Sequence, residues 1–355
     1  MAWRLFWRQP LVRWAVALLA CLYGAMLLAE PLAPYGPQSI HREGSLLPPT
    51  ALHWRGGLPQ VYPQVQGPVD RQTGEQQVIE DRSQPVALGL WVKGDPYRWL
   101  GVIPGDRHLI GVRDPVAHWH LLGTDEQGRD TLSRLLYGSR ISLLVGLLGI
   151  ALTFPLGVVI GAWSGYMGRW IDGTLMRFTE VLMSVPSLYL LVALAAVLQT
   201  NPLTGVPFSN PERFVIIVAI TSLVSWAGLA RVIRGQVLSL RSRDYVLAAQ
   251  VMGAGTFRIL WRHLIPQTTT YLLISATLAI PGFIAAEAVL SLIGLGIQQP
   301  DPSWGNMLSL ATNASIMVLH PWLVVAPVSL IMLTSFCLNV IGDGLRDALD
   351  PSHLS

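Results

Sequence analysis

Long runs without a charged residue constrain this chain more than any other feature. No charge occurs between Arg140 and Arg169, and uncharged apolar stretches recur at residues 14–29 and between Glu180 and Glu212. Such runs suit helices that cross a bilayer, each of which needs about 20 predominantly apolar residues. Only 13% of the residues are charged, against roughly a quarter in soluble domains. The composition therefore excludes disorder and argues against a soluble enzyme.

Six apolar stretches predict an all-α polytopic membrane protein with six transmembrane helices. The expected spans are 14–29, 141–168, one span after Glu180, 214–230, 271–295 and 322–341. Turn signals at 201–211 end the third span, and Pro186 is expected to kink it. The first stretch has no small-x-small cleavage site, so it is interpreted as an uncleaved span and not as a signal peptide.

The composition divides the chain into four parts. They are a cytoplasmic arm with the first helix (1–29), an extracytoplasmic insert with a re-entry segment (30–140), a five-helix core (141–341) and a cytoplasmic tail (342–355). The insert is nearly neutral, with 11 basic and 12 acidic residues. Short apolar runs at 85–92 and 100–112, broken by turn signals at 93–96 and 104–106, predict small strands and hence mixed or β character.

The distribution of arginine predicts the orientation. The loop at 231–265 carries six arginines against Asp244 alone, and the first 13 residues carry three arginines and no acidic residue. Cytoplasmic segments of membrane proteins are enriched in basic residues. Both termini are therefore expected in the cytoplasm and the insert outside.

Small residues recur at a spacing of four in the second span: Gly149, Thr153, Gly157, Gly161 and Gly165. This spacing places them on one face of a helix and allows a neighbouring helix to approach closely. Helix packing is the first interpretation of this row, and the lining of a substrate path is the alternative.

The loop at 231–266 is patterned as two helices. Asp244 is expected to cap a helix through Met252, glycines at 253 and 255 to turn the chain, and Thr256 to begin a helix that ends at Ile265, before a proline. Ala248 and Ala249 are expected to pack inward. A rigid basic helical pair at the membrane surface suits docking to another protein, and no nucleic-acid partner is expected.

This loop resembles the cytoplasmic signature of binding-protein-dependent ABC importer permeases, E-A-A-x3-G-x9-I-x-L-P. Residues 247–253 (LAAQVMG) and 263–266 (HLIP) match its spacing, with Leu247, His263 and Ile265 as departures. Further blocks are similar to the second permease subunit of dipeptide, oligopeptide and nickel importers. They are 122–130 (LGTDEQGRD), 133–144 (SRLLYGSRISLL), 286–296 (AEAVLSLIGLG), 302–308 (PSWGNML) and 342–351 (GDGLRDALDP).

The resemblance implies a type I ABC importer permease fold in a bacterial inner membrane. It implies a second homologous permease, one or two ATP-binding subunits and an extracytoplasmic solute-binding protein as partners. ATP and magnesium would be bound by the partner ATPase, and this chain would hold no cofactor. The loop at 245–266 would contact the ATPase through Ala248, Ala249, Gly253, Ala254, Gly255, Thr256 and Arg258.

The residues themselves agree that the chain is no ATPase. Its only lysine, Lys93, follows a valine, whereas a phosphate-binding P-loop needs a Gly-Lys pair. No nucleophile motif, paired catalytic carboxylates or zinc-protease spacing is present either, so no enzyme activity is expected.

A few polar residues remain as candidates outside this loop. Glu287, an acidic residue within a span, is interpreted either as a hydrogen-bond partner for another helix or as part of the translocation path. Asp301 and Trp304 could contact the binding protein, or they could belong to a capped turn. His118 and His120 would share a face in an extended chain, but two ligands make a poor metal site.

The favoured function is a permease subunit for di- or oligopeptides. A nickel chelate or another small solute is the alternative cargo. A channel or self-contained secondary transporter would show inverted repeats or ion-coupling residues, and a simple membrane anchor would leave the loop at 231–266 unexplained.

Overall fold

The computed structural model describes residues 2–41, 44–55, 58–69, 76–83, 85–114, 117–201 and 204–349. The chain forms two compact units. Unit 1 comprises Met1–Leu19, Val145–Leu290 and Thr334–Ser355, and unit 2 comprises Ala20–Leu144 and Ser291–Leu333. The boundaries between them fall inside long helices, so both units contain membrane-spanning candidates.

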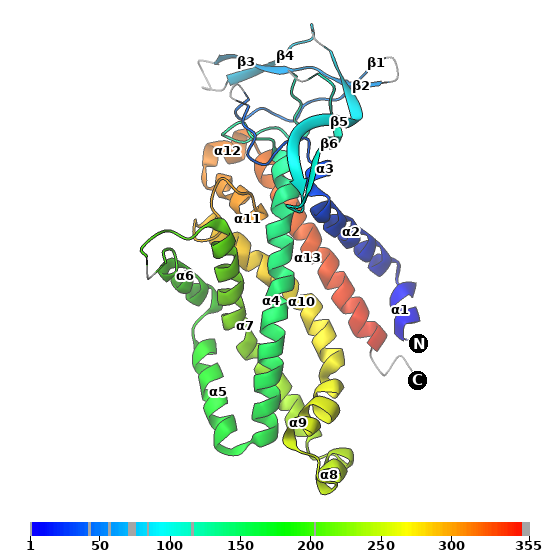
Figure 1. Ribbon diagram of the computed structural model, residues 1–355, viewed down its shortest axis with the longest axis vertical. Helices are drawn as coiled ribbons and strands as arrows, with labels where there is room; N and C mark the ends of the chain where they lie inside the picture. Colours follow the sequence, from blue (N-terminus) through cyan, green and yellow to red (C-terminus); the bar gives the residue numbers. More distant parts are fainter. Residues whose placement is uncertain are drawn as a thin grey trace. The chain divides into compact units, whose positions relative to one another are not determined.

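Five helical stretches in the described part of the chain are long and apolar enough to cross a membrane. They are α2 (Pro10–Leu27), α4 (Thr131–Met167), α7 (Asn210–Leu240), Thr256–Leu292, which ends in α10 (Thr269–Leu292), and α13 (Trp322–Leu349) (Figure 1). A sixth is obtained if α5 (Arg169–Ser184) and α6 (Ser187–Val197) form one bent span. The helical, polytopic architecture is confirmed, with six as the upper count of spans.

The third span differs from the expected single helix. Helix α5 already begins at Arg169, and α5 and α6 meet at an angle of 87°. Val185 between them has an extended backbone, as expected for a residue that precedes a proline. Pro186 therefore separates two helices instead of kinking one.

The row of small residues on α4 packs against other helices of unit 1. Gly157 lies against Leu229 of α7, Gly161 against the backbone of Ala230, and Gly165 against Val237. Gly149 lies against Phe283 of α10. A side chain at these positions would push the helices apart, so helix packing is confirmed for the four glycines.

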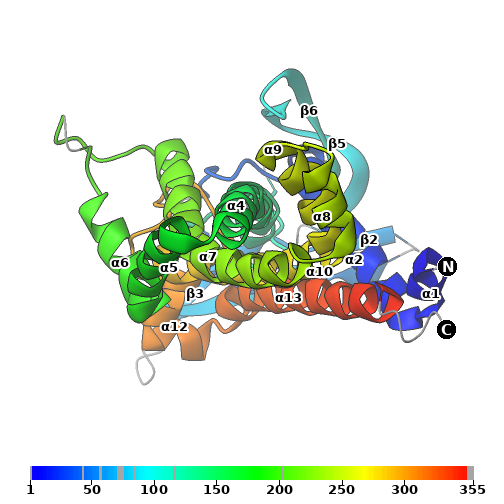
Figure 2. The same ribbon diagram turned by 90° about the horizontal axis from the view of Figure 1, so that it is seen from below.

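The chain termini meet within unit 1. Phe6 of α1 (Ala2–Arg8) and Val12 pack with Ala348 near the end of α13, and Gly344 lies against Val12 (Figure 2). Residues 342–349, expected as the start of a cytoplasmic tail, continue α13 beyond the expected end of the sixth span at residue 341. The last residues of the tail and of the 342–351 block lie outside the described part of the chain.

The insert in unit 2 has the expected β character. After the short α3 (Ala29–Leu32), four strands form an antiparallel sheet in the order β1-β2-β5-β6, and β3 and β4 form a separate hairpin. The strands are β1 (His53–Arg55), β2 (Leu58–Val61), β3 (Gln64–Val69), β4 (Gln76–Glu80), β5 (Val86–Trp99) and β6 (Ile103–Val112).

The longest hairpin, β5–β6, turns at a different place from the predicted one. The residues 93–96, expected as a turn, lie inside β5, where the pairing register shifts between Lys93 and Tyr97. The chain reverses instead at Leu100 and Gly101, both at positive φ. The Gly-Asp-Pro signal thus marks an irregularity in a continuous strand, which β-bulges accommodate.

The blocks of unit 2 that resemble the importer family, at 122–130, 133–144 and 302–308, contribute to a buried polar network. Asp130 accepts a hydrogen bond from the backbone N–H of Ser133 (2.7 Å), which caps α4, and it contacts Nδ1 of His120 (2.9 Å). Arg134 donates to Oε1 of Gln299 (3.0 Å). Two short helices, α11 (Trp304–Met307) and α12 (Ala314–Leu319), follow. These blocks therefore build the fold of unit 2.

Candidate functional site: an exposed knob and a hydroxyl-lined cavity

Residues 244–259 of unit 1 form a compact helical pair, called the knob here. It consists of α8 (Asp244–Val251), a turn, and α9 (Thr256–Ile259), which lie side by side in Figure 2. Gly253 ends α8 with a φ of +82°, a conformation that favours glycine. Asp244 lies in the first turn of α8, whereas Arg243 occupies the cap position without a side-chain bond, so the predicted capping by Asp244 is wrong.

The base of the knob is firmly packed. Val246 and Ile259 are buried in one cluster with residues of α4 and α7, among them Val158 and Ile233, and Ala249 is buried as well. Nε2 of Gln250 also donates to the hydroxyl of Tyr166 on α4 (3.2 Å). The knob is thus an extension of the helix core and not a loose loop.

The outer face of the knob exposes large apolar side chains. Val251 is 89% exposed, Met252 80% and Phe257 70%. Leu247 is exposed beside them. The sequence analysis did not select these residues, although apolar residues around a Gly-x-Gly turn in a basic loop were the available signal. Exposed apolar groups of this size on a rigid base mark an interaction surface.

Some of the residues predicted to contact the ATPase are buried in the knob, and others are exposed on it. Ala249 is buried as expected, but Ala248 is exposed, so the inward packing predicted for Ala248 is wrong. The turn and α9 expose Gly253, Gly255 and Arg258, and they half-bury Ala254 and Thr256.

The second helix of this loop does not end at Ile265. A π turn (Leu260–Leu264) and a 3₁₀ turn (Ile265–Thr268) lead from α9 into α10 without a break. Pro266 lies in the first turn of the 3₁₀ segment, where a missing N–H removes no helical hydrogen bond. The proline is therefore accommodated, and α9 and α10 form one continuous helical stretch.

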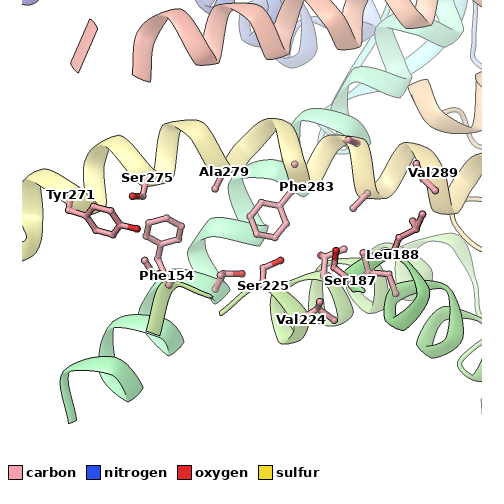
Figure 3. Close-up of a pocket in the computed structure, with 17 residues that line it drawn as sticks. Phe154, Ser187, Leu188, Val224, Ser225, Tyr271, Ser275, Ala279, Phe283 and Val289 are labelled. Carbon is pink, nitrogen blue, oxygen red and sulfur yellow. The ribbon is translucent and has the colours of Figure 1, made fainter. Parts of the chain in front are cut away.

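A cavity of about 520 Å³ lies between α4, α6, α7 and α10 in unit 1. Figure 3 shows Tyr271 and Ser275 of α10 on one side, with Phe154 and Ser225 opposite. Six hydroxyl groups line it, among apolar side chains: those of Thr153, Ser187, Thr221, Ser225, Tyr271 and Ser275. None of the described lining residues carries a charge.

Thr153 has different surroundings from the four glycines of the small-residue row on α4. Its side chain is buried and lines the cavity, and its Oγ1 has no hydrogen-bond partner among the described residues. The hydroxyl of Thr221 donates to the backbone oxygen of Ile217 (2.7 Å). Thr153 therefore lines the cavity, whereas the glycines pack against neighbouring helices.

Glu287 is fully buried in α10. The cavity lining includes Ala286 and Val289 from the same helix but not Glu287. The structure thus places this carboxyl group in the helix packing, outside the cavity.

The predicted binding-protein contacts in unit 2 are mostly internal. The side chain of Trp304 is buried, and its indole N–H donates to the backbone oxygen of Leu135 (3.0 Å). An exposed contact by Trp304 is therefore wrong, and the capped turn is observed, since Ser303 accepts from the N–H of Asn306 (2.9 Å). Asp301 is half-buried and accepts from Nε2 of Gln38 (3.1 Å).

His118 and His120 lie in a cluster with His41, whose ring centroid is 3.8 Å from that of His118. Burial, and then the neighbouring His118 and His120, lower the pKa of His41 to about 4. His41 is therefore neutral at physiological pH. Among the residues that the structure describes, no three His, Cys, Asp or Glu side chains are arranged to hold a metal ion.

Comparison with known proteins agrees with these features. Residues 157–353 match the family described as binding-protein-dependent transport system inner membrane component. The oligopeptide transport system permease protein OppC of Haemophilus influenzae is 41% identical over 246 residues, 69% of this chain and 75% of the relative. The dipeptide transport system permease protein DppC of Bacillus subtilis is 44% identical over 67% of this chain and 70% of its own.

The OppC protein of Escherichia coli is 41% identical over 65% of this chain and 72% of its own. The family match includes the knob and three of the helices around the cavity, α6, α7 and α10, but not the α4 residues that line it. The chain belongs to the family of binding-protein-dependent transport system inner membrane components.

Proposed function

We propose that this chain is a membrane-spanning subunit of an ATP-driven importer of di- or oligopeptides. The names of its relatives as oligopeptide and dipeptide permeases support this class of solute. The observation that carries the mechanism is the knob, which combines an exposed apolar face with a buried base. A packed element can transmit the movement of a docked partner to the helices, whereas a flexible loop would absorb it.

The partner that docks on the knob is proposed to be an ATP-binding subunit, present as one or two kinds of chain. ATP and magnesium would be bound there, and this chain would hold no cofactor. A second homologous permease would complete the path. An extracytoplasmic solute-binding protein would deliver the solute and contact the insert or Asp301, in agreement with the binding-protein dependence of the family.

The proposed orientation places the knob and both termini in the cytoplasm. Four arginines are exposed on the knob and next to it: Arg241, Arg243, Arg258 and Arg262. Such an excess of basic residues is typical of the cytoplasmic side of inner membrane proteins. The insert, with its balanced charge, would then lie outside.

The cavity is proposed to be this subunit's share of the translocation path. Hydroxyl groups can donate and accept hydrogen bonds, so they suit the amide groups that all peptides share. An uncharged lining imposes no selection on the charge of the peptide side chains. A metal ion would favour imidazole or thiolate ligands, and ion-coupled transport would favour ionisable groups in the membrane; the described lining contains neither.

Glu287 is proposed to act in helix packing, because it is buried beside the cavity and does not line it. Glu287→Gln should lower the thermal unfolding temperature of the purified complex, while the folded protein transports at a normal rate per molecule. Normal stability with altered transport would instead assign Glu287 to the path.

The docking proposal is tested by making the face of the knob charged. Val251→Asp together with Met252→Asp should reduce peptide uptake by reconstituted complex about tenfold or more, since each lost apolar anchor removes about 1–2 kcal/mol. ATP hydrolysis by the partner should then no longer respond to the loaded binding protein. The matched control is Val251→Leu together with Met252→Leu, which keeps an apolar side chain at both exposed positions. Normal uptake by the double aspartate variant would refute docking at this face.

A further inference from the structure

The turn of the β5–β6 hairpin in unit 2 exposes aliphatic side chains. Leu100, Val102 and Ile103 are all exposed, Val102 by 77%. Hairpin turns in water are usually built from polar residues and glycine. Here only Gly101 follows that rule, and Leu100 adopts a φ of +50°, which is uncommon for a residue with a side chain. A turn of this composition needs an apolar surrounding.

Two hydrogen bonds fix this turn to the end of a membrane-spanning helix. The indole N–H of Trp99 donates to the backbone oxygen of Leu27 (2.9 Å), the last residue of α2. The backbone N–H of Leu100 donates to Oε1 of Glu30 (3.1 Å). Figure 1 shows the hairpin reaching α3, which directly follows α2.

The groups around these bonds are those found where a span leaves the bilayer. Glu30 is buried and pairs with the guanidinium of Arg140, which also donates to the backbone oxygen of Met26 (3.1 Å). Tyr137 lies beneath that guanidinium. Trp, Tyr and Arg are typical of the membrane–water interface, so this end of α2 marks the depth of the headgroups.

The turn is therefore held at the depth of the headgroups, with its aliphatic side chains exposed. Leu27 and Leu28, at the helix end to which it is bonded, are exposed as well. Little of α2 is covered by the rest of the described chain, so its apolar surface is available to lipid. The exposed surface of the turn thus adjoins the apolar surface of a helix that is suited to cross the bilayer.

We propose that the β5–β6 turn inserts Leu100, Val102 and Ile103 into the acyl-chain region of the leaflet at the Leu27 end of α2. The occupant of this apolar surface is phospholipid. The hairpin then acts as a membrane anchor for the insert, independently of the solute that the complex transports.

The test places a fluorescent probe on the turn. Cys21 and Cys337 are first replaced by alanine, Val102→Cys is introduced, and the thiol is labelled with an NBD group in the reconstituted complex. Ile79→Cys on β4, another exposed apolar position of the insert, is the matched control. Quenching is measured with phospholipid spin-labelled near the headgroup and with aqueous iodide.

The probe at residue 102 should be quenched several-fold more by the spin-labelled lipid than the probe at residue 79, and several-fold less by iodide. Equal iodide quenching at the two positions would overturn the proposal, because the turn would then lie in water. Protection from both quenchers would also overturn it, since the turn would then be covered by protein.

Discussion

The knob and the β5–β6 turn both expose branched apolar side chains, but they are anchored in different ways. The knob stands on buried residues such as Val246 and Ala249, and basic side chains lie around it. The turn is bonded through Trp99 to the end of α2. The first setting would provide rigidity and charge for the proposed protein partner, and the second would fix the proposed depth of the turn in the bilayer.

The comparison shows that exposure alone does not identify the partner of an apolar surface. Val251 and Val102 are similarly exposed, yet the groups that hold them differ. Aromatic residues and a span end lie beside the turn, which is the reason for proposing lipid there. A packed core lies beneath the knob, which is the reason for proposing a protein partner there.

The largest effect is expected from a charged substitution on the buried face of α8, compared with the same substitution on its exposed face. Ala249→Arg would place an unpaired charge at a buried position of α8, at a cost of about 3–5 kcal/mol. The knob should detach from its base by local unfolding, so uptake should be lost while the rest of the complex stays assembled. Uptake and limited proteolysis of the loop, both in reconstituted complex, measure this.

The neighbouring Ala248→Arg is the matched variant, because Ala248 is exposed. It should leave the base packed and the loop resistant to protease. Equal protease sensitivity in the two variants would contradict the division of α8 into a buried and an exposed face.

Part of this architecture follows from the sequence. The four-residue spacing of Gly157, Gly161 and Gly165 predicts a close helix contact. Glycines on one face of a helix allow a neighbouring helix to approach closely, whichever helix that is. The helical pair of the knob also follows from local signals at Gly253 and Thr256. Which of the two adjacent alanines faces inward depends on the base formed by α4 and α7, which local signals do not reveal.

Other features depend on distant segments. The cavity combines hydroxyl groups from four helices, such as Thr153 and Ser275, and none of them forms a motif along the chain. Pro266 signals a helix end but lies where a 3₁₀ turn tolerates it. Trp304 matches a family block on a connecting segment, but it is buried and its indole N–H donates to the backbone oxygen of Leu135, far away in the sequence.

A smaller effect is expected at the two glycine turns. Gly253 and Gly101 have φ values of +82° and +78°, and an added Cβ would meet no atom within 4 Å at either one. Alanine should therefore cost only the backbone strain of about 1–2 kcal/mol at each. Gly253→Ala should weaken the coupling of ATP hydrolysis to uptake, and Gly101→Ala should reduce lipid quenching at residue 102 without changing coupling.

Gly255→Ala is the control for the first turn, since its φ of −70° suits any residue and its surroundings are equally open. Its coupling should equal that of the unmodified complex. A loss of coupling as large as that of Gly253→Ala would show that contact with the partner, and not backbone strain, determines the effect.

The smallest effect is expected from weakening the attachment of the β5–β6 hairpin to α2. Trp99→Phe keeps an aromatic ring but removes the hydrogen bond to Leu27, which contributes about 1 kcal/mol. Lipid quenching of the probe at residue 102 should fall measurably while uptake stays the same. Tyr97→Phe removes a bond of similar length, to the backbone oxygen of Arg107 (2.8 Å), within the hairpin. If Tyr97→Phe lowers the quenching equally, the depth of the turn depends on the stiffness of the hairpin and not on its attachment to the span.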